Sequence, residues 1–282
     1  MLIQVLNGLQ FAMLLLLLSA GLSVIFGLMN FVNLAHGTLY MVGAYLGLTA
    51  VRLTGSFVVG LLVAALGTTL VGVLLYKTLF ERLQSSNPVR QVLLTFGVIF
   101  VGLDAVRYIW GNDTHSVALP PLLSGSVQIL GEPYPVYRLF IIATGLVVLA
   151  ILHLLLDRTR VGAMVRAAVD HRDAAECLGI PVRRLFLGVF ALGCCLAGLA
   201  GMIAAPVLSV YPGMEMPVLV LTLVIVVVGG PGSLVGAALG SVLIGMADTF
   251  GRLFLPGFAA FLMYAVIAAF LVVRPQGFMP VR

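Results

Sequence analysis

The chain has 282 residues, of which 62% are hydrophobic and only 9% are charged. Soluble domains carry about 25% charged residues, so this composition excludes an ordinary soluble protein. The net charge of +5 does not indicate nucleic-acid binding, because 14 of the 15 basic residues are arginines that lie mainly in short connectors between apolar runs. We therefore predict an all-α integral membrane protein with one domain, a polytopic helical bundle over 1–282.

Apolar runs of about twenty residues, enough to cross a hydrocarbon core of about 30 Å, recur along the chain. Because 28–33 is short and polar, the first two runs are either separate spans or one broken element. The sequence thus predicts eight to nine spans with broken helices. The candidate spans are 7–28, 31–51, 57–76, 92–110, 136–156, 185–206, 214–229, 233–250 and 257–273.

The distribution of basic residues predicts the orientation. Eleven of the 15 basic residues fall in 77–90, in 157–184 and in the C-terminal tail, which strict alternation of the spans places on one side. Cytoplasmic connectors are enriched in Arg and Lys. We therefore expect a cytoplasmic C-terminus and a periplasmic N-terminus.

Two connectors are long. The outer one, 111–135, is rich in Pro and Gly, so we expect an irregular periplasmic loop with a short hairpin around Val127 to Leu130. The inner one, 158–184, has the Ala, Met, Arg and Glu content of a helix over 161–178, with Gly179 at the position of a C-cap. This helix suits either a groove on a partner protein or the surface of membrane lipid.

The first interruption of the apolar pattern is MNFVNLAHGTLYMVGAY at 29–45. If this segment is helical, Asn30, Asn33, His36 and Tyr40 fall within an arc of about 120°. Amides, imidazole and phenol on one face hydrogen-bond a zwitterion or line a wet path. The alternative for each residue is a hydrogen bond between helices.

The second interruption is GGPGSLVGAALGSVLIG at 229–245. Glycines at a spacing of four form a groove for a closely packed neighbour, which we expect here. Interrupted segments in both halves of a membrane chain also indicate a translocation path between them. The glycines concerned are Gly229, Gly230, Gly232, Gly236 and Gly240.

Motifs of catalysis are missing from the sequence. Lys77 is the single lysine and no G-x-x-x-x-G-K-[ST] pattern occurs, so any ATP must be hydrolysed by another protein. His and Cys residues lack metal spacing, and no hydrolase elbow is present. We expect no catalytic residue, metal or cofactor.

Ion coupling usually needs ionisable residues at mid-membrane. Asp104, Glu215 and Asp248 fall near predicted span ends, which leaves His36 and His153 as mid-depth candidates. His153, alone on an apolar helix, is interpreted as a packing residue. An ion-coupled carrier or channel is therefore the weaker hypothesis.

Six segments in a fixed order resemble the permease subunits of branched-chain amino acid ABC importers, a family that also includes urea and amide permeases. The likeness covers nearly the whole chain. The segments are FGLMNFVNLAHGTLYMVGAY at 26–45, LLTFG at 93–97, RTRVGAMVRAAVDHRDAAECLGIPVRRLF at 158–186, GLAG at 198–201, GGPGSLVGAALG at 229–240 and RPQGF at 274–278.

The resemblance implies a bacterial inner-membrane importer with two ATPase subunits, a second related permease and a periplasmic solute-binding protein. It favours docking of the connector at 158–184 on an ATPase. The coupling residues it implies are Arg166, Ala167, Asp170, Ala174, Ala175, Gly179 and Ile180. The path residues are Asn30, Asn33, His36, Tyr40 and Thr95.

The sequence departs from this family just after the AHG string. Many relatives carry an acidic residue there, whereas this chain has Thr38. This departure favours neutral or anionic solutes. Urea, amides and organic acids stay open as solutes beside branched-chain amino acids, because the binding protein does much of the selecting.

Overall fold

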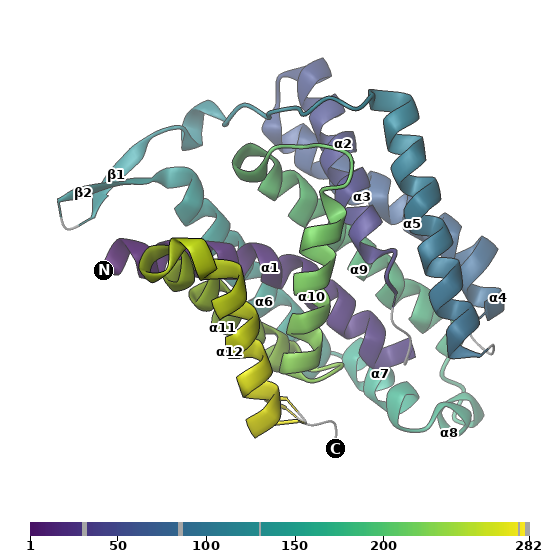
Figure 1. The fold of residues 1–282 in the computed structure, drawn as a ribbon. Helices are drawn as coiled ribbons and strands as arrows, with labels where there is room; N and C mark the ends of the chain where they lie inside the picture. Colours follow the sequence, from purple (N-terminus) through teal and green to yellow (C-terminus); the bar gives the residue numbers. More distant parts are fainter. Residues whose placement is uncertain (30–32, 84–86, 130, 276, 280–282) are drawn as a thin grey trace.

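The computed structural model describes residues 1–29, 33–83, 87–129, 131–275 and 277–279. It is a helical bundle with a small β-hairpin at one end (Figure 1). In chain order the elements are α1 (Leu2–Met29), α2 (His36–Thr54), α3 (Phe57–Leu75), a π-helical turn (Tyr76–Phe80), α4 (Glu81–Leu83), α5 (Pro88–Trp110), a short 3-10 turn (Pro121–Leu123), β1 (Ser126–Ile129), β2 (Glu132–Pro135), α6 (Val136–Arg158), α7 (Arg160–Asp170), α8 (Arg172–Cys177), α9 (Val182–Leu208), α10 (Glu215–Gly229), α11 (Leu234–Phe254), a second 3-10 turn (Pro256–Phe258) and α12 (Ala259–Val273).

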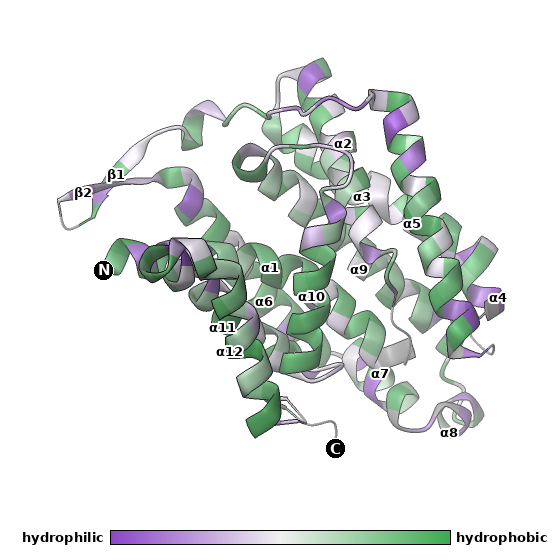
Figure 2. Cartoon of the chain, in the orientation of Figure 1, coloured by the Kyte–Doolittle hydropathy of each residue, from purple (hydrophilic) through white to green (hydrophobic). Residues whose placement is uncertain are grey.

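The core of the bundle is α1. Of the most apolar stretch of α1, 83% is buried, compared with 11% for α12. α1 packs against α6, α9, α10 and α11, while α2 packs against α3 and α9. Outer helices such as α5 and α12 stay apolar on their exposed faces (Figure 2). Exposed apolar faces of this length suit contact with lipid.

The predicted all-α membrane fold is confirmed. Within the described ranges, seven helices are long and apolar enough to cross a membrane. α2 and α10 complete the nine predicted spans, but α10 has only 15 residues. α2 has 19 residues and a more polar sequence, HGTLYMVGAYLGLTAVRLT, so it does not reach the same hydropathy.

The ends of α2, α5 and α9 meet on one side of the bundle. Nη2 of Arg52 lies 3.0 Å from Nδ1 of His115, which pairs through its backbone with Val210. Arg138 at the start of α6 donates a hydrogen bond to Asn7 of α1. The N-terminal end of α1 therefore lies on the side of the 111–135 loop.

The 157–184 connector lies at the opposite end of the bundle. Arg183, at the start of α9, donates to the carboxylate of Glu81 in α4. This hydrogen bond lowers the pKa of Glu81 below its ordinary value. The two basic inner segments predicted from the sequence therefore share one side.

The predicted hairpin is present as β1 and β2. The strands are antiparallel, with Val127 opposite Tyr134. Gly131 between them has a φ of +85°, a conformation that glycine adopts without a steric penalty.

Replacing Tyr137 with phenylalanine should lower stability by about 1 kcal/mol. The buried Tyr137 hydroxyl donates to the carbonyl oxygen of Ile203 at 2.8 Å and ties α6 to α9. Thermal unfolding of the purified protein in detergent measures the change. Tyr108→Phe is the control, because Tyr108 is 93% exposed. Equal midpoints for the two variants would show that the bond contributes nothing.

Candidate functional site

The polar segment predicted at 29–45 is not one helix. α1 ends at Met29 and α2 begins at His36, while Asn30 lies outside the described residues. The carbonyl oxygen of Asn33 accepts a hydrogen bond from the His36 amide at 3.2 Å. The predicted continuous helical face is therefore wrong for Asn33, because the chain forms a turn there before α2 begins.

α2 begins alongside the middle of α1. Nε2 of His36 lies 3.2 Å from the carbonyl oxygen of Leu18. Leu18 is eleven residues before Met29, the last residue of α1. At 1.5 Å per residue this distance is about 16 Å along the helix. α2 therefore starts inside the bundle.

His36 and Tyr40 lie where α2 packs against α1 and α9. A Cβ added at Gly21 of α1 would lie 3.3 Å from Nε2 of His36, and one added at Gly201 of α9 would overlap the Tyr40 carbonyl oxygen. Both side chains are buried. His36 and the backbone of Tyr40 thus lie at close contacts of α2 with α1 and α9.

Another side of α2 meets α5 and α10. A Cβ added at Gly37 would lie 3.5 Å from Cβ of Glu215 in α10, and one added at Gly102 of α5 would overlap the Thr38 side chain. Tyr45 lies two turns after Thr38 and therefore on the same side of the helix. Gly37, Thr38 and Tyr45 thus face a different set of helices from His36.

Thr95 is buried on α5. Its hydroxyl donates to the Val92 carbonyl oxygen in the same helix at 2.8 Å. Thr95 is seven residues, or two turns, before Gly102, and so lies on the face of α5 that meets α2.

Partnerless polar atoms concentrate on the α2 segment and at Glu215. A buried polar group without a hydrogen bond costs about 1–3 kcal/mol, so such groups are rare unless they serve a function. All but Tyr134 belong to this region. Within the described residues, the side chains concerned are Asn33, His36, Thr38, Tyr40, Tyr45, Tyr134 and Glu215.

Glu215 was missed as an interior group because its position in the sequence lies near a predicted span end. It is fully buried as the first residue of α10. The available signal was a lone carboxylate between apolar residues with no basic residue nearby in sequence. His153, in contrast, is half-exposed near the end of α6, where Nδ1 lies 2.7 Å from the Asp157 carboxylate.

The last turns of α1, just before the first interrupted segment, meet the second interrupted segment in space. A Cβ added at Gly27, near the end of α1, would overlap Cα of Gly232 in the loop before α11. The Ser23 hydroxyl donates to the Ser233 carbonyl oxygen at 3.4 Å. Segments about 200 residues apart in the chain therefore form one junction.

The remaining glycines allow close packing next to this junction. A Cβ at Gly229 would lie 2.6 Å from the carbonyl oxygen of Gly236, and one at Gly240 would lie 3.1 Å from that of Ile225. These contacts join α10 to α11. At Gly230, a Cβ would overlap the backbone of Met279, where the C-terminal tail packs on the end of α10.

The connector contains two helices instead of the one predicted at 161–178. α7 ends at Asp170 and α8 begins at Arg172, with His171 in an extended conformation between them. The break allows apolar residues of both helices to be buried, Ala168 in α7 and Ala175 in α8. Burial against the bundle thus overrides the helix propensity of the segment.

Gly179 ends α8 with a φ of +80°. The Ile180 amide donates to the Ala175 carbonyl oxygen at 3.0 Å, which closes the C-terminal turn. Ala174 and Gly179 are exposed, whereas Ala167 and Ile180 are half-buried.

Arg166 does not extend from the connector. Its guanidinium donates to the Leu156 carbonyl oxygen and lies 3.6 Å from the Asp157 carboxylate, both at the end of α6. The side chain of Asp170 lies outside the described residues.

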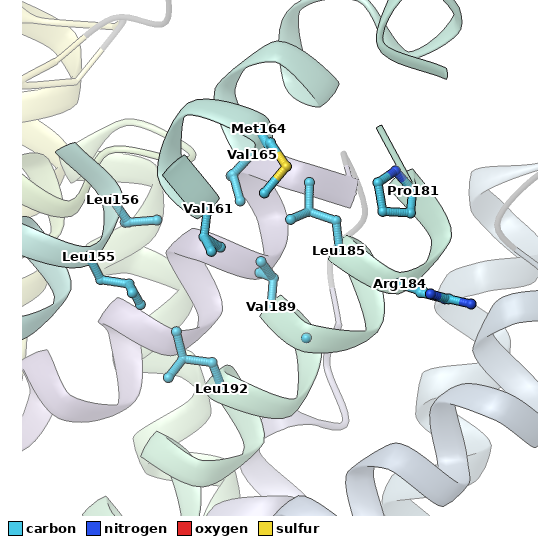
Figure 3. A pocket seen from close by; sticks show the side chains of 11 residues that line it. Leu155, Leu156, Val161, Met164, Val165, Pro181, Arg184, Leu185, Val189 and Leu192 are labelled. Carbon is cyan, nitrogen blue, oxygen red and sulfur yellow. The ribbon is translucent and has the colours of Figure 1, made fainter. Parts of the chain in front are cut away.

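An apolar groove of 410 Å³ separates α7 from the ends of α6 and α9 (Figure 3). Val161 and Val165 of α7 face Val189 of α9 across it, while Arg184 extends away from the apolar side chains. Beside the groove, the buried Val165 and Ala168 belong to the main apolar core and hold α7 to the membrane body.

Residues 4–272 match the family model described as the permease component of the branched-chain amino acid transport system. The chain is 25% identical to BraD, the high-affinity branched-chain amino acid transport system permease protein of Pseudomonas aeruginosa, covering 97% of this chain and 94% of BraD. It is 26% identical to LivH of Escherichia coli K12, with the same coverage. It is also 26% identical to the probable LivH of Methanocaldococcus jannaschii, covering 94% and 88%.

Proposed function

The chain belongs to the permease family of branched-chain amino acid transport systems, and we propose that it lines the path by which an ABC importer moves these amino acids across the inner membrane. It is a multi-pass membrane permease. In this proposal 1–282 form a single permease domain, with 111–135 periplasmic and 158–184 cytoplasmic.

The start of α2 inside the bundle and the contact of the end of α1 with the second interrupted segment support this proposal most strongly. Gly27 contacts Gly232, and α2 begins beside the middle of α1. Unpaired backbone is tolerated at membrane depth only where protein covers it or a cavity is wet. Transporters place solute sites at such broken helices. We assign the solute path to the region beside this junction.

Polar groups along the path would exchange their missing hydrogen bonds for bonds to the solute. Asn33 offers two donors and an acceptor, and Thr38 offers a hydroxyl. Thr95 extends the row of polar side chains along α5 toward the inner end of the bundle. His36 and Tyr40 support the packing that positions α2, and Asn30 stays a proposed path residue.

We assign ATPase docking to α8 and the turn that follows it. Leu178 is 81% exposed beside the exposed Ala174 and Gly179, so a small apolar surface extends from the inner end. Closure of two ATPases would move α7 and α8, and the packing of α7 against α1 and α9 would pass this motion to the bundle. A second related permease and a binding protein complete the proposed importer.

Affinity purification of the tagged chain from native membranes in mild detergent tests this function. We expect P-loop ATPases and a second, similar permease to co-purify. Reconstitution of that complex with its binding protein should then give ATP-dependent leucine uptake. Uptake by this chain alone in proteoliposomes would instead support an ion-coupled carrier.

A further inference from the structure

Glu215 is a buried acidic side chain that has no basic partner among the described residues. It is the first residue of α10 and its side chain is buried, and its polar neighbours among the described residues are the backbone amides of Gly213 and of Glu215 itself. Taking an unpaired carboxylate out of water is costly. Ionisable residues retained inside membrane bundles mark ion or solute pathways.

The surroundings of Glu215 are formed by α2. Gly37 brings the helices close, since a Cβ there would lie 3.0 Å from Cβ of Leu219 and 3.3 Å from the Glu215 carbonyl oxygen. Thr38 is the next residue, and its hydroxyl is buried without a partner. Tyr45, two turns further, is close enough for the carboxylate to act on it electrostatically, and its hydroxyl is also partnerless.

One cation acts on Glu215 from a distance. Arg107 of α5 influences the carboxylate electrostatically but lies 3.7 Å from Asp104, on the exposed part of its own helix. Among the described residues, no basic side chain pairs directly with Glu215. The Glu215 carboxylate is therefore available to bind a cation that enters the bundle.

We propose that the Glu215 carboxylate binds the ammonium group of the transported amino acid, with the Thr38 and Tyr45 hydroxyls as neighbouring hydrogen-bonding groups. This inference rests on the proposed function. It also changes the expectation of a neutral or anionic solute that was drawn from Thr38. In the fold, α10 supplies a carboxylate next to that position. The solute class it names is a zwitterion with a free ammonium group.

Binding of leucine to the purified, assembled complex without its binding protein tests the role of Glu215. The control solute is the hydroxy acid analogue of leucine, in which a hydroxyl replaces the ammonium group. We expect the wild type to bind leucine about tenfold more tightly than the analogue, which corresponds to about 1.4 kcal/mol. Glu215→Gln should bind both equally. An unchanged preference in Glu215→Gln overturns the inference.

A second measurement uses the unaltered protein, so it does not depend on the folding of a variant. Dicyclohexylcarbodiimide reacts with carboxyl groups in apolar surroundings, and mass spectrometry of the peptide reports modification of Glu215. Leucine should slow the modification and the hydroxy acid should not. Equal modification with and without leucine contradicts direct contact.

The two proposals fail in different ways. If the wild-type complex takes up leucine and Glu215→Gln keeps the same preference, only the role of Glu215 is wrong. If the wild-type complex hydrolyses ATP and takes up only solutes without an ammonium group, both proposals are wrong.

Discussion

Ala174→Arg should leave the permease folded in the membrane but abolish its association with the ATPase subunits, whereas Ala175→Arg should destabilise the permease itself. These neighbours on α8 differ in burial: Ala174 is exposed and Ala175 is 2% exposed. A bulky cation at 174 blocks close contact with a partner groove. At 175 it must enter the bundle, at a cost of roughly 3 kcal/mol or more.

Two measurements separate these outcomes. Thermal unfolding of each variant in detergent reports stability, and co-purification with the ATPases reports docking. Normal ATPase recovery and normal uptake with Ala174→Arg would contradict the assignment of ATPase docking to α8. Equal stability of the two variants would contradict the burial of Ala175.

Gly179 gives a related test of the same docking surface. A Cβ at Gly179 meets nothing within 4 Å, but the φ of +80° strains most side chains. Asparagine tolerates this conformation better than other residues. We therefore expect Gly179→Arg to abolish ATP-dependent uptake and Gly179→Asn to retain more of it. Equal loss in both would indicate that the glycine conformation matters more than the space it leaves for a partner.

Gly236→Ala should destabilise the protein by about 3 kcal/mol and abolish uptake. A Cβ at this position would overlap the carbonyl oxygen of Gly229 and lie 2.6 Å from its carbon, both backbone atoms that no rotamer change can move. The substitution forces α10 away from α11. Because Glu215 begins α10, the same displacement disturbs the proposed solute site.

Gly240→Ala is the matched control, one turn later in α11. Its nearest neighbour would be the Ile225 carbonyl oxygen at 3.1 Å, so a shift of a few tenths of an ångström accommodates the methyl group. Alanine also gains about 1 kcal/mol in helix propensity over glycine, which offsets part of the cost. A Gly236→Ala variant as stable and active as Gly240→Ala would contradict the close contact of the two helices.

The spans follow from composition and local rules. A hydrocarbon core sets a length of about twenty apolar residues, so α3, α5, α6, α9, α11 and α12 are visible as runs in the sequence. Turn chemistry also acts locally, since glycine is favoured where φ is positive. The end of α8 at Gly179 therefore agrees with its predicted position, and Gly131 lies in the turn of the hairpin predicted around Val127 to Leu130.

Contacts between segments that are distant in sequence determine which side chains form the candidate site. Periodicity groups residues on one face but does not show which neighbour that face meets. The sequence favoured His36 and Tyr40, and the fold adds Thr38, which it places against α5. Likewise, burial of Ala175 divides a segment whose local propensity predicts one helix.

Glu215 shows most clearly the difference between what the sequence determines and what the tertiary structure decides. Its carboxylate is visible in the sequence, but only the approach of α10 to Gly37 removes it from water. The start of α2 is decided in the same way, by the contact of His36 with the Leu18 carbonyl oxygen of α1. Hydropathy and propensity are sums over neighbours in sequence, whereas burial depends on which helices pack together.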